Sequence, residues 1–600
     1  MSTPSARRWR WRSLWAAIVV AGVVLKALLS PFFIFNAAYD DGLMVEMARG
    51  FLDGHWSSSW SSTGIVTLAK PVGFPLFLAG AHALPWSPVM TVYLLALAGA
   101  VLTAWSWRRL SGSWAQATAV LTVLILDPIA FTATSQRVYR DSFIGAVTDL
   151  AIGLAFVIAA ELGARRRVDG GEPADDTGPA HRHRRPSRLR RGVPFVLALC
   201  IGLLVGVVAV TKPTWQWLPI AISAPLAVPL LRRLRAARWR PVALARVGLA
   251  CLLAAVGTWG VIESVIVMNQ RTYGVALVED FSAGGLSRTW KAWASVEAGT
   301  PEHGVQITRP MRLAVYRVSP TAAELASYLE SPDDPWKSID CTSSVHICDE
   351  SGNWFEWDLQ SAAASTGTVH SAVEFQQFFD RLADEIEHAC TAGSLRCTSS
   401  PVLATGLPPL DRIPVGSLAS ETARGMEQMT VDRLPMGSTD LPRPTPAQYR
   451  LWSSVVPGMA PIGDVSADST PSGVLLMLEL LDGLARIVDL VLLAAITLGV
   501  VAWMLDRTVW RRRGRVPGDP VAGVASALFL VSWVVGMGLL AVFAAGRAWP
   551  DYVEPVYWTD FATPAQLCLV LGAFAAWPTL RGRLRRDSAV AVPGGTPGPA

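Results

Sequence analysis

The sequence of 600 residues is poor in charge and poor in cysteine. Charged residues make up 16% of it, whereas soluble globular domains average about 25%. Hydrophobic residues reach 51% and the mean hydropathy is +0.36, so a wholly soluble or disordered chain is excluded. A total of 7 Cys excludes a small disulfide-rich secreted scaffold. The composition predicts a polytopic α-helical membrane protein.

Lysine is scarce as well, with only five among the 52 basic residues. Such Arg-heavy, Ala/Gly/Val-rich usage is typical of a high-GC bacterial genome. The arginines do not form one basic face interleaved with aromatic residues, as nucleic-acid binding requires, but lie between apolar runs. We therefore expect a multi-pass protein of a bacterial plasma membrane, in contact with membrane lipids and with no nucleic-acid partner.

Apolar runs of about 20 residues predict about ten transmembrane helices. They lie at 13–35, 87–107, 114–135, 142–160, 193–211, 214–231, 247–268, 474–504, 521–545 and 564–580. The run 71–86 is short and interrupted by Pro, which predicts a re-entrant or interfacial segment.

The basic residues fix the predicted orientation. Thirty arginines lie before the first run or in alternate loops between the others, including nine in 161–192. By the positive-inside rule these loops and both termini are cytoplasmic. The first apolar run is of full length and lacks a small-residue cleavage site, so we expect no cleavable signal. Loop 165–191 has few apolar residues and is expected to be disordered.

Four parts follow from this topology. They are an N-terminal transmembrane module, 1–268, with a first external loop at 36–86; an extracytoplasmic domain of about 200 residues, 269–472; a C-terminal transmembrane module, 473–585; and a disordered cytoplasmic tail, 586–600. The extracytoplasmic domain is expected to be mixed α/β. Within it, 371–390 reads as an amphipathic helix, and 401–471, rich in Pro, Ser, Thr and Gly, as irregular or extended.

Four cysteines of this domain form two C-x6-C pairs, Cys341 with Cys348 and Cys390 with Cys397. An extracytoplasmic location permits disulfides. Three connectivities are open, of which we favour the two local pairs. The alternative is a zinc site with His346 and His388, but the spacing matches no standard zinc pattern.

The first external loop carries the densest chemical signal. Asp40 and Asp41 follow the first span and precede an amphipathic helix whose apolar positions include Leu43, Met47 and Phe51. That helix is suited to the membrane surface. Capping a helix needs one carboxylate, whereas two adjacent acids beside lipid are costly. The pair therefore suggests a general base, a metal ligand or both.

These residues resemble a known family. Tyr39-Asp40-Asp41-Gly42, the following helix with Ala48-Arg49-Gly50-Phe51, and the stretch 70–76 (KPVGFPL) look like the first luminal loop of the GT-C class of integral membrane glycosyltransferases, a superfamily that includes protein mannosyltransferases. The second external loop, 136–142 (QRVYRDS), is similar to the acidic second loop of that class. The last loop, 546–555, resembles its Arg-Tyr-x-x-Pro segment, although four residues separate Arg547 from Tyr552 here.

The resemblance implies a sugar transfer from a polyprenyl-phosphate donor to an acceptor hydroxyl on the external face, by a single inverting attack. Asp40 would be the base, or the ligand of a divalent metal if one is used; Asp41 would assist and Asp141 would be the second-loop acid. The external cations would bind the donor phosphate, with at least three of them converging on one pocket; they are Lys70, Arg137, Arg140, Lys212 and Arg547. Further candidates near these loops are Tyr39, Tyr139, Tyr552 and His55.

Two other classes of function stay open. A transporter or flippase of a lipid-linked or anionic substrate would need mid-membrane charges and an internal repeat, and no convincing repeat is present. A non-catalytic receptor or cell-envelope assembly protein would act through its extracytoplasmic domain. The sequence leaves the sugar and the acceptor (a glycan, a lipid or a protein) undetermined.

Overall fold

The computed structural model describes most of the chain as helix. The described residues are 4–29, 40–56, 67–131, 133–169, 188–213, 215–236, 241–300, 305–337, 348–430, 445–456, 472–510, 520–547 and 560–590. The helices of the N-terminal part are α1 (Pro4–Ala27), α2 (Asp40–Leu52), α3 (Gly73–Ala81), α4 (Pro88–Ser111), α5 (Trp114–Ile125), η2 (Pro128–Phe131), α6 (Ala133–Gln136), α7 (Arg140–Asp169), α8 (Arg188–Ala209), α9 (Leu218–Ala236) and α10 (Pro241–Tyr273). Those of the remainder are α11 (Gly284–Ala294), α12 (Arg309–Tyr316), α13 (Pro320–Glu324), α14 (Ala326–Leu329), η3 (Gly352–Trp354), α16 (Phe355–Ser365), α17 (Ala372–Thr391), η4 (Leu410–Arg412), α18 (Val415–Thr430), α19 (Pro446–Ser453), α20 (Ser472–Trp510), α21 (Pro520–Arg547) and α22 (Ala562–Val590).

The chain is a multi-pass membrane protein, with six described helical stretches long and apolar enough to cross a membrane. They are Pro88–Ser111, Trp114–Phe131, Arg140–Leu162, Gly192–Ala209, Leu244–Tyr273 and Ala522–Val542. Leu218–Ala227 and Ala562–Trp577 are shorter apolar helices. The predicted count of ten is therefore not confirmed. The described part of α1 begins among arginines and ends at Ala27, and α20 carries Glu479, Asp482, Arg486 and Asp489.

Close packing of the bundle depends on small residues. A Cβ on Gly99 of α4 would clash with the backbone of α7 at Asp149, and one on Gly202 of α8 would clash with Ala254 of α10. Glycine lets two helix backbones approach closely enough for van der Waals packing, which is what associates helices where no hydrophobic effect operates. These contacts fix α4 beside α7 and α8 beside α10.

Residues 284–395 form a helical domain with its own core. Trp290 and Trp293 of α11, Phe355 of α16 and Phe375 and Phe379 of α17 are buried together. Helix α17 confirms the amphipathic helix predicted at 371–390, with Ser371 as its N-cap. The predicted mixed α/β character is not confirmed, because the described residues of 269–472 contain an isolated bridge between Val296 and Cys397 but no strand. The apolar residues recur at helical, not alternating, spacing.

The stretch 401–471 is also more ordered than predicted. It contains α18 and α19, where the sequence suggested irregular or extended backbone. Thr445 and Gln448 form a reciprocal capping box at the start of α19, so this short helix has a local stabilising motif that its proline-rich surroundings obscured.

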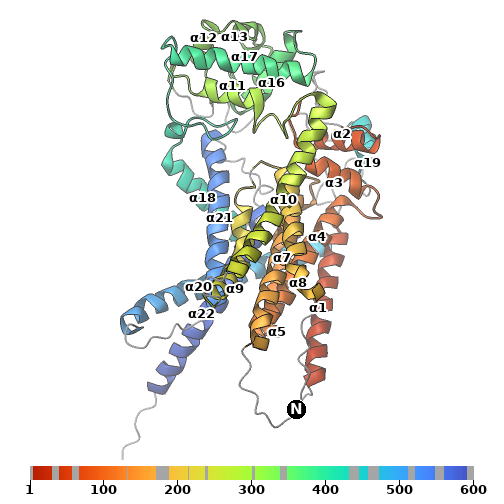
Figure 1. Ribbon diagram of the computed structural model, residues 1–600, viewed down its shortest axis with the longest axis vertical. Helices are drawn as coiled ribbons and strands as arrows, with labels where there is room; N and C mark the ends of the chain where they lie inside the picture. Colours follow the sequence, from red (N-terminus) through yellow and green to blue (C-terminus); the bar gives the residue numbers. More distant parts are fainter. Residues whose placement is uncertain are drawn as a thin grey trace, which may run out of the picture.

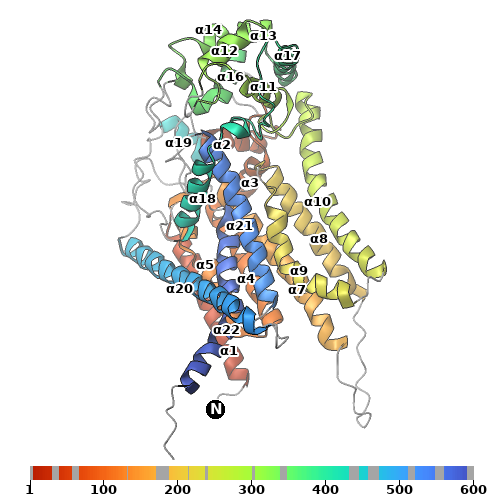
Figure 2. The same cartoon turned by 90° about the vertical axis from the view of Figure 1, so that its left-hand side faces the viewer.

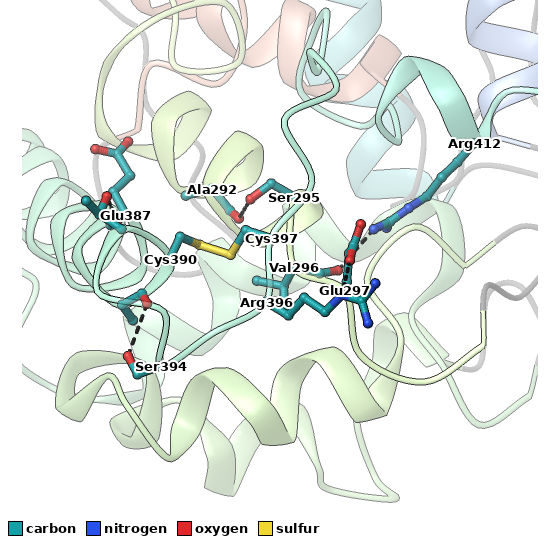
Figure 3. Close-up of a disulfide and its surroundings, with 12 residues drawn as sticks. Ala292, Ser295, Val296, Glu297, Glu387, Cys390, Ser394, Arg396, Cys397 and Arg412 are labelled. Atoms are coloured by element: carbon teal, nitrogen blue, oxygen red, sulfur yellow. Dashed lines mark hydrogen bonds and ion pairs between the residues drawn. A yellow bond between two sulfur atoms is a disulfide. The ribbon is translucent and has the colours of Figure 1, made fainter.

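Disulfide pairing agrees with the predicted local pairs where it is described. Cys390, in the last turn of α17, is bonded to Cys397 beside the Val296 bridge (Figure 3). Because both thiols are oxidised, they are not available as zinc ligands. Cys348 is disulfide-bonded, whereas its expected partner Cys341 lies outside the described residues.

The 284–395 domain and the N-terminal end of α1 lie at opposite ends of the long axis of the molecule (Figure 1). Helices α2, α3 and α19 lie at the domain end of the bundle in both views (Figures 1 and 2). The first predicted external loop and the domain therefore share one end of the bundle.

Candidate functional site

Helix α2 places two carboxylates at the domain end of the bundle. It begins at Asp40, so Asp40 and Asp41 occupy its first turn, where the helix dipole favours negative charge. Met44, Val45, Met47 and Ala48 are almost fully buried against the protein, so much of the apolar face expected to lie on the membrane is covered. Asp40 and Asp41 are adjacent in sequence but have different partners.

Asp40 faces two cations and a phenol. The Lys70 ammonium lies 2.8 Å from Oδ1 of Asp40, and the Tyr139 hydroxyl donates to Oδ2 at 3.0 Å. Nη2 of Arg140 lies 3.4 Å from the same Oδ2. Burial by itself would raise the pKa of Asp40, but the charges of Lys70 and Arg140 and these hydrogen bonds lower it to about 2. Asp40 is therefore ionised at neutral pH.

Asp41 is fully buried and bound to Arg137. Nε of Arg137 donates to both carboxylate oxygens, at 3.0 and 3.2 Å, and Nη2 donates to Oδ1 as well. The Arg137 guanidinium also lies 4.2 Å from the ring centroid of Tyr139. A bidentate pair with 4% exposure of the arginine fixes the 137–141 loop on the first turn of α2.

Asp141 belongs to a second cluster, with Lys212 and Asp560. The Lys212 ammonium donates to Asp141 and, at 3.0 Å, to Asp560. Burial opposes the charge of Lys212, yet the two carboxylates outweigh burial and raise its pKa. Burial raises the pKa of Asp560. Nε of Arg140 lies 3.8 Å from Asp141 and so joins this cluster to Asp40.

The structure thus brings together eight of the predicted site residues. They are Asp40, Asp41, Lys70, Arg137, Tyr139, Arg140, Asp141 and Lys212. His55 is exposed, and it forms no hydrogen bond or ion pair with this cluster within the described part of the chain. Tyr39, Tyr552 and the side chain of Arg547 lie outside the described residues. The roles assigned to these residues stay predictions.

Three neighbours were missed by the sequence reasoning. Asp560 lies two residues before α22 and Asp141 lies in the first turn of α7, so each acid marks the N-terminal end of an apolar helix. Glu279 and Asp280 follow α10 as a second pair of adjacent acids, and this repeat of the Asp40-Asp41 pattern was the signal available. Burial raises the pKa of Glu279, opposed by a hydrogen bond from Ser282 and by the charges of Lys70 and Arg140.

Among the described residues, the cations and carboxylates of the cluster are equal in number. Lys70, Arg137, Arg140 and Lys212 each face at least one of the carboxylates of Asp40, Asp41, Asp141 and Asp560. These pairs are buried, where charges are poorly screened. An anionic ligand must therefore share or displace a carboxylate at one of the cations.

The described residues do not provide a metal site. They contain no group of three or more His, Cys, Asp or Glu side chains placed to hold a metal ion. Both oxygens of Asp40 already face cationic or hydroxyl donors. We therefore derive no step through a metal.

No family model matches the sequence, and no curated protein matches it. Two solved structures are similar over 98% of this chain and 82% of theirs, at 13% identity. They are ArnT from Cupriavidus metallidurans in the apo state, with a TM-score of 0.32, and ArnT bound to undecaprenyl phosphate, with a TM-score of 0.30. We transfer no residue role from these structures, because the identity and the TM-scores are low.

Proposed function

We propose that the chain is a GT-C glycosyltransferase that moves a sugar from a polyprenyl-phosphate donor to an acceptor hydroxyl. The observation that carries this proposal is the meeting of Asp40, Lys70 and Arg140 in one buried cluster at the domain end of the bundle. The positive-inside pattern of the arginines supports an external position for this end and a cytoplasmic position for both termini.

The proposed reaction needs a base and a stabilised leaving group. Asp40 takes the proton of the acceptor hydroxyl, whose oxygen attacks the anomeric carbon of the donor sugar. The bond from that carbon to the phosphate oxygen breaks, and its electron pair stays on the phosphate. Lys70 and Arg140 stabilise the charge that develops there. One such attack inverts the anomeric centre.

Lys70 and Arg140 connect donor binding to the basicity of Asp40. Both cations hold the pKa of Asp40 at about 2, which makes it a weak base before substrate binds. A donor phosphate that attracts these cations weakens their electrostatic stabilisation of the ionised Asp40 carboxylate. The pKa of Asp40 then rises toward its ordinary value, so the base becomes stronger when the leaving group is in place.

The test is the substitution Asp40→Asn, compared with Asp53→Asn. Asp53 follows the same helix but is 45% exposed and pairs with Arg49 in a surface contact. Wild-type protein in membranes is first supplied with a panel of undecaprenyl-phosphate-linked sugars, and release of undecaprenyl phosphate is measured. With the active donor, we expect Asp40→Asn to lower the rate by about 10²–10⁴-fold and Asp53→Asn to leave it unchanged.

The outcomes separate the alternatives. Full release of undecaprenyl phosphate by Asp40→Asn refutes the assignment of the base. No release from any lipid-linked sugar, together with movement of such a lipid across vesicle membranes, favours the transporter. Loss of function only when the 269–472 region is deleted, with Asp40→Asn unaffected, favours a receptor or assembly protein.

A further inference from the structure

The segment that carries Lys70 has little regular structure of its own. Thr67–Lys70 form neither helix nor strand, yet their residues are buried. The C-terminal side of the segment is held to the bundle, because the Gly73 amide donates to the Val210 carbonyl at 2.9 Å. A second attachment on the N-terminal side would fix the backbone on both sides of Lys70, whose ammonium lies 2.8 Å from Asp40.

Asp280 provides that second attachment. The amide of Leu68 donates to Oδ2 of Asp280 at 2.7 Å, and the amide of Asp280 donates to the Leu68 carbonyl at 2.9 Å. Asp280 is 1% exposed, so water does not replace these bonds. A buried amide or carboxylate left without its partner carries a desolvation penalty, which makes this pairing costly to break.

The domain fixes Asp280 in turn. Nε2 of Gln376, on α17, donates to Oδ1 of Asp280 at 2.6 Å, while Oε1 of Gln376 accepts from the Gly285 amide at 2.8 Å. Gly285 lies in the first turn of α11. The chain of bonds therefore runs from α11 through Gln376 and Asp280 to Leu68, two residues before Lys70.

Two aromatic residues complete the surroundings of Lys70, namely Trp357 of the domain and Phe281, which precedes it. The ring of Trp357 lies 4.6 Å and that of Phe281 5.6 Å from the Lys70 ammonium. Phe281 directly follows Asp280, and the two rings meet edge to face, with centroids 4.8 Å apart. Rings at these distances attract a cation and exclude water from it.

We propose that Asp280 is a positioning residue through which the 284–395 domain sets Lys70 against Asp40 and the donor phosphate. The inference rests on the proposed function, in which Lys70 binds that phosphate. It assigns the domain a part in donor binding that does not depend on the identity of the acceptor. Asp280 itself touches neither the reacting atoms nor the donor.

The test exploits the direction of the hydrogen bonds at Gln376. Asp280→Asn places the new side-chain NH2 group, a donor, against the NH2 group of Gln376, which is also a donor. Either the hydrogen bond between the two side chains is lost, or the Gln376 amide rotates and loses its hydrogen bond with the Gly285 amide. Adding Gln376→Glu restores acceptors for both the new amide and Gly285. We expect Asp280→Asn to raise the KM for the lipid-linked donor about tenfold, with kcat changed less than threefold. We expect the double variant to recover to within twofold of wild type.

Binding of undecaprenyl phosphate to the full-length protein in detergent gives a readout separate from turnover. Asp280→Asn should weaken this binding by about the same factor as it raises KM, and Asp380→Asn should not change it. Asp380 lies one turn further along α17, is 45% exposed and contacts Arg288 instead. Thermal unfolding of each variant identifies any that fail to fold, and the double variant then carries the test.

Two results would overturn the inference. One is an unchanged KM and unchanged undecaprenyl phosphate binding in folded Asp280→Asn; the other is a double variant no better than the single one. Failure of the proposed function is distinct, because it is read from Asp40→Asn, which would then keep full transfer activity.

Discussion

Two buried ion networks in this chain differ in where their members come from. In the domain, Arg312 is 1% exposed and its guanidinium donates to Glu330, at 2.7 Å, and to Glu350. All three residues lie within one stretch of the domain, and the Tyr316 hydroxyl also donates to Glu330. The site cluster instead joins α2, the Lys70 segment, the 137–141 loop, Lys212 and Asp560, which are far apart in sequence.

Their contact geometry differs as well. The Arg312 guanidinium donates to two carboxylates and to the Ile307 carbonyl, so several hydrogen bonds hold it in place. In the site, Arg140 reaches two carboxylates at 3.4 and 3.8 Å, distances longer than good hydrogen bonds. The comparison teaches that burial of charge alone does not mark a site. The site cluster differs in joining segments that are far apart in sequence and in having Arg140 shared between two carboxylates.

The largest expected effect is on the domain network. Arg312→Met leaves Glu350 without its cation and Glu330 with only the exposed Arg309 beside it, so we expect the free energy of unfolding to fall by about 3–5 kcal/mol. Denaturant unfolding of the full-length protein in detergent measures this loss. Arg309→Met removes a 65% exposed partner of Glu330 and should cost less than about 1 kcal/mol. If folded Arg312→Met protein had a lowered kcat, the contrast between a structural and a functional network would fail.

The next effect is on catalysis. Lys70→Gln should lower kcat/KM for the donor by about 100-fold, since a charge-assisted contact to phosphate is lost. Removing this cation also raises the pKa of Asp40, so activity should fall on acidification at a higher pH than in wild type. Lys291→Gln, at an exposed position of the domain, serves as the control. Equal kcat/KM values for the two variants would contradict a role of Lys70 in donor binding.

A third effect concerns Asp280, which connects the Lys70 segment to the domain. Burial raises the pKa of Asp280 to about 7, from 3.8. Between these values the native state keeps a proton that the unfolded state has lost, so stability falls as pH rises from about 4 to 7. The slope is at most about 1.4 kcal/mol per pH unit. Asp280→Asn cannot titrate and should flatten this part of the curve, measured by unfolding at several pH values. An unchanged slope would show that another group titrates.

The smallest effect is expected at the surface of the domain. Arg288 contacts Asp380, Asp384 and Glu387 of α17, but all four side chains are at least 42% exposed. Solvent screens such pairs, so Arg288→Ala should lower the unfolding free energy by less than about 1 kcal/mol. A loss as large as that of Arg312→Met would mean that exposure does not separate these networks.

Local signals in the sequence were reliable where one element decides the outcome. The period of apolar residues in 371–390 predicted α17, and the C-x6-C spacing predicted the Cys390–Cys397 pair. The secondary-structure prediction was wrong where a stretch carries conflicting local signals. Proline and serine around α19 obscured its capping box.

The site shows the same division. The arginine pattern predicted that Asp40, Lys70 and Arg140 lie on one side of the membrane, because the positive-inside rule orients every loop at once. The loop motifs did not pair Asp40 with Lys70 or Asp41 with Arg137, nor bring Asp560 to Lys212. Asp280 was not found, because its role depends on the Leu68 amide it faces and not on its own neighbours.

By itself, the sequence determined that the chain is a membrane protein and which residues lie near its predicted external loops. Hydropathy and charge act through the solvent each segment can enter, so they can be read one segment at a time. Only the tertiary structure decided which carboxylate faces which cation, and that the domain holds the Lys70 segment. Coulomb attraction and hydrogen bonding act over a few ångströms, and only folding brings residues 41 and 137, or 68 and 280, within that distance.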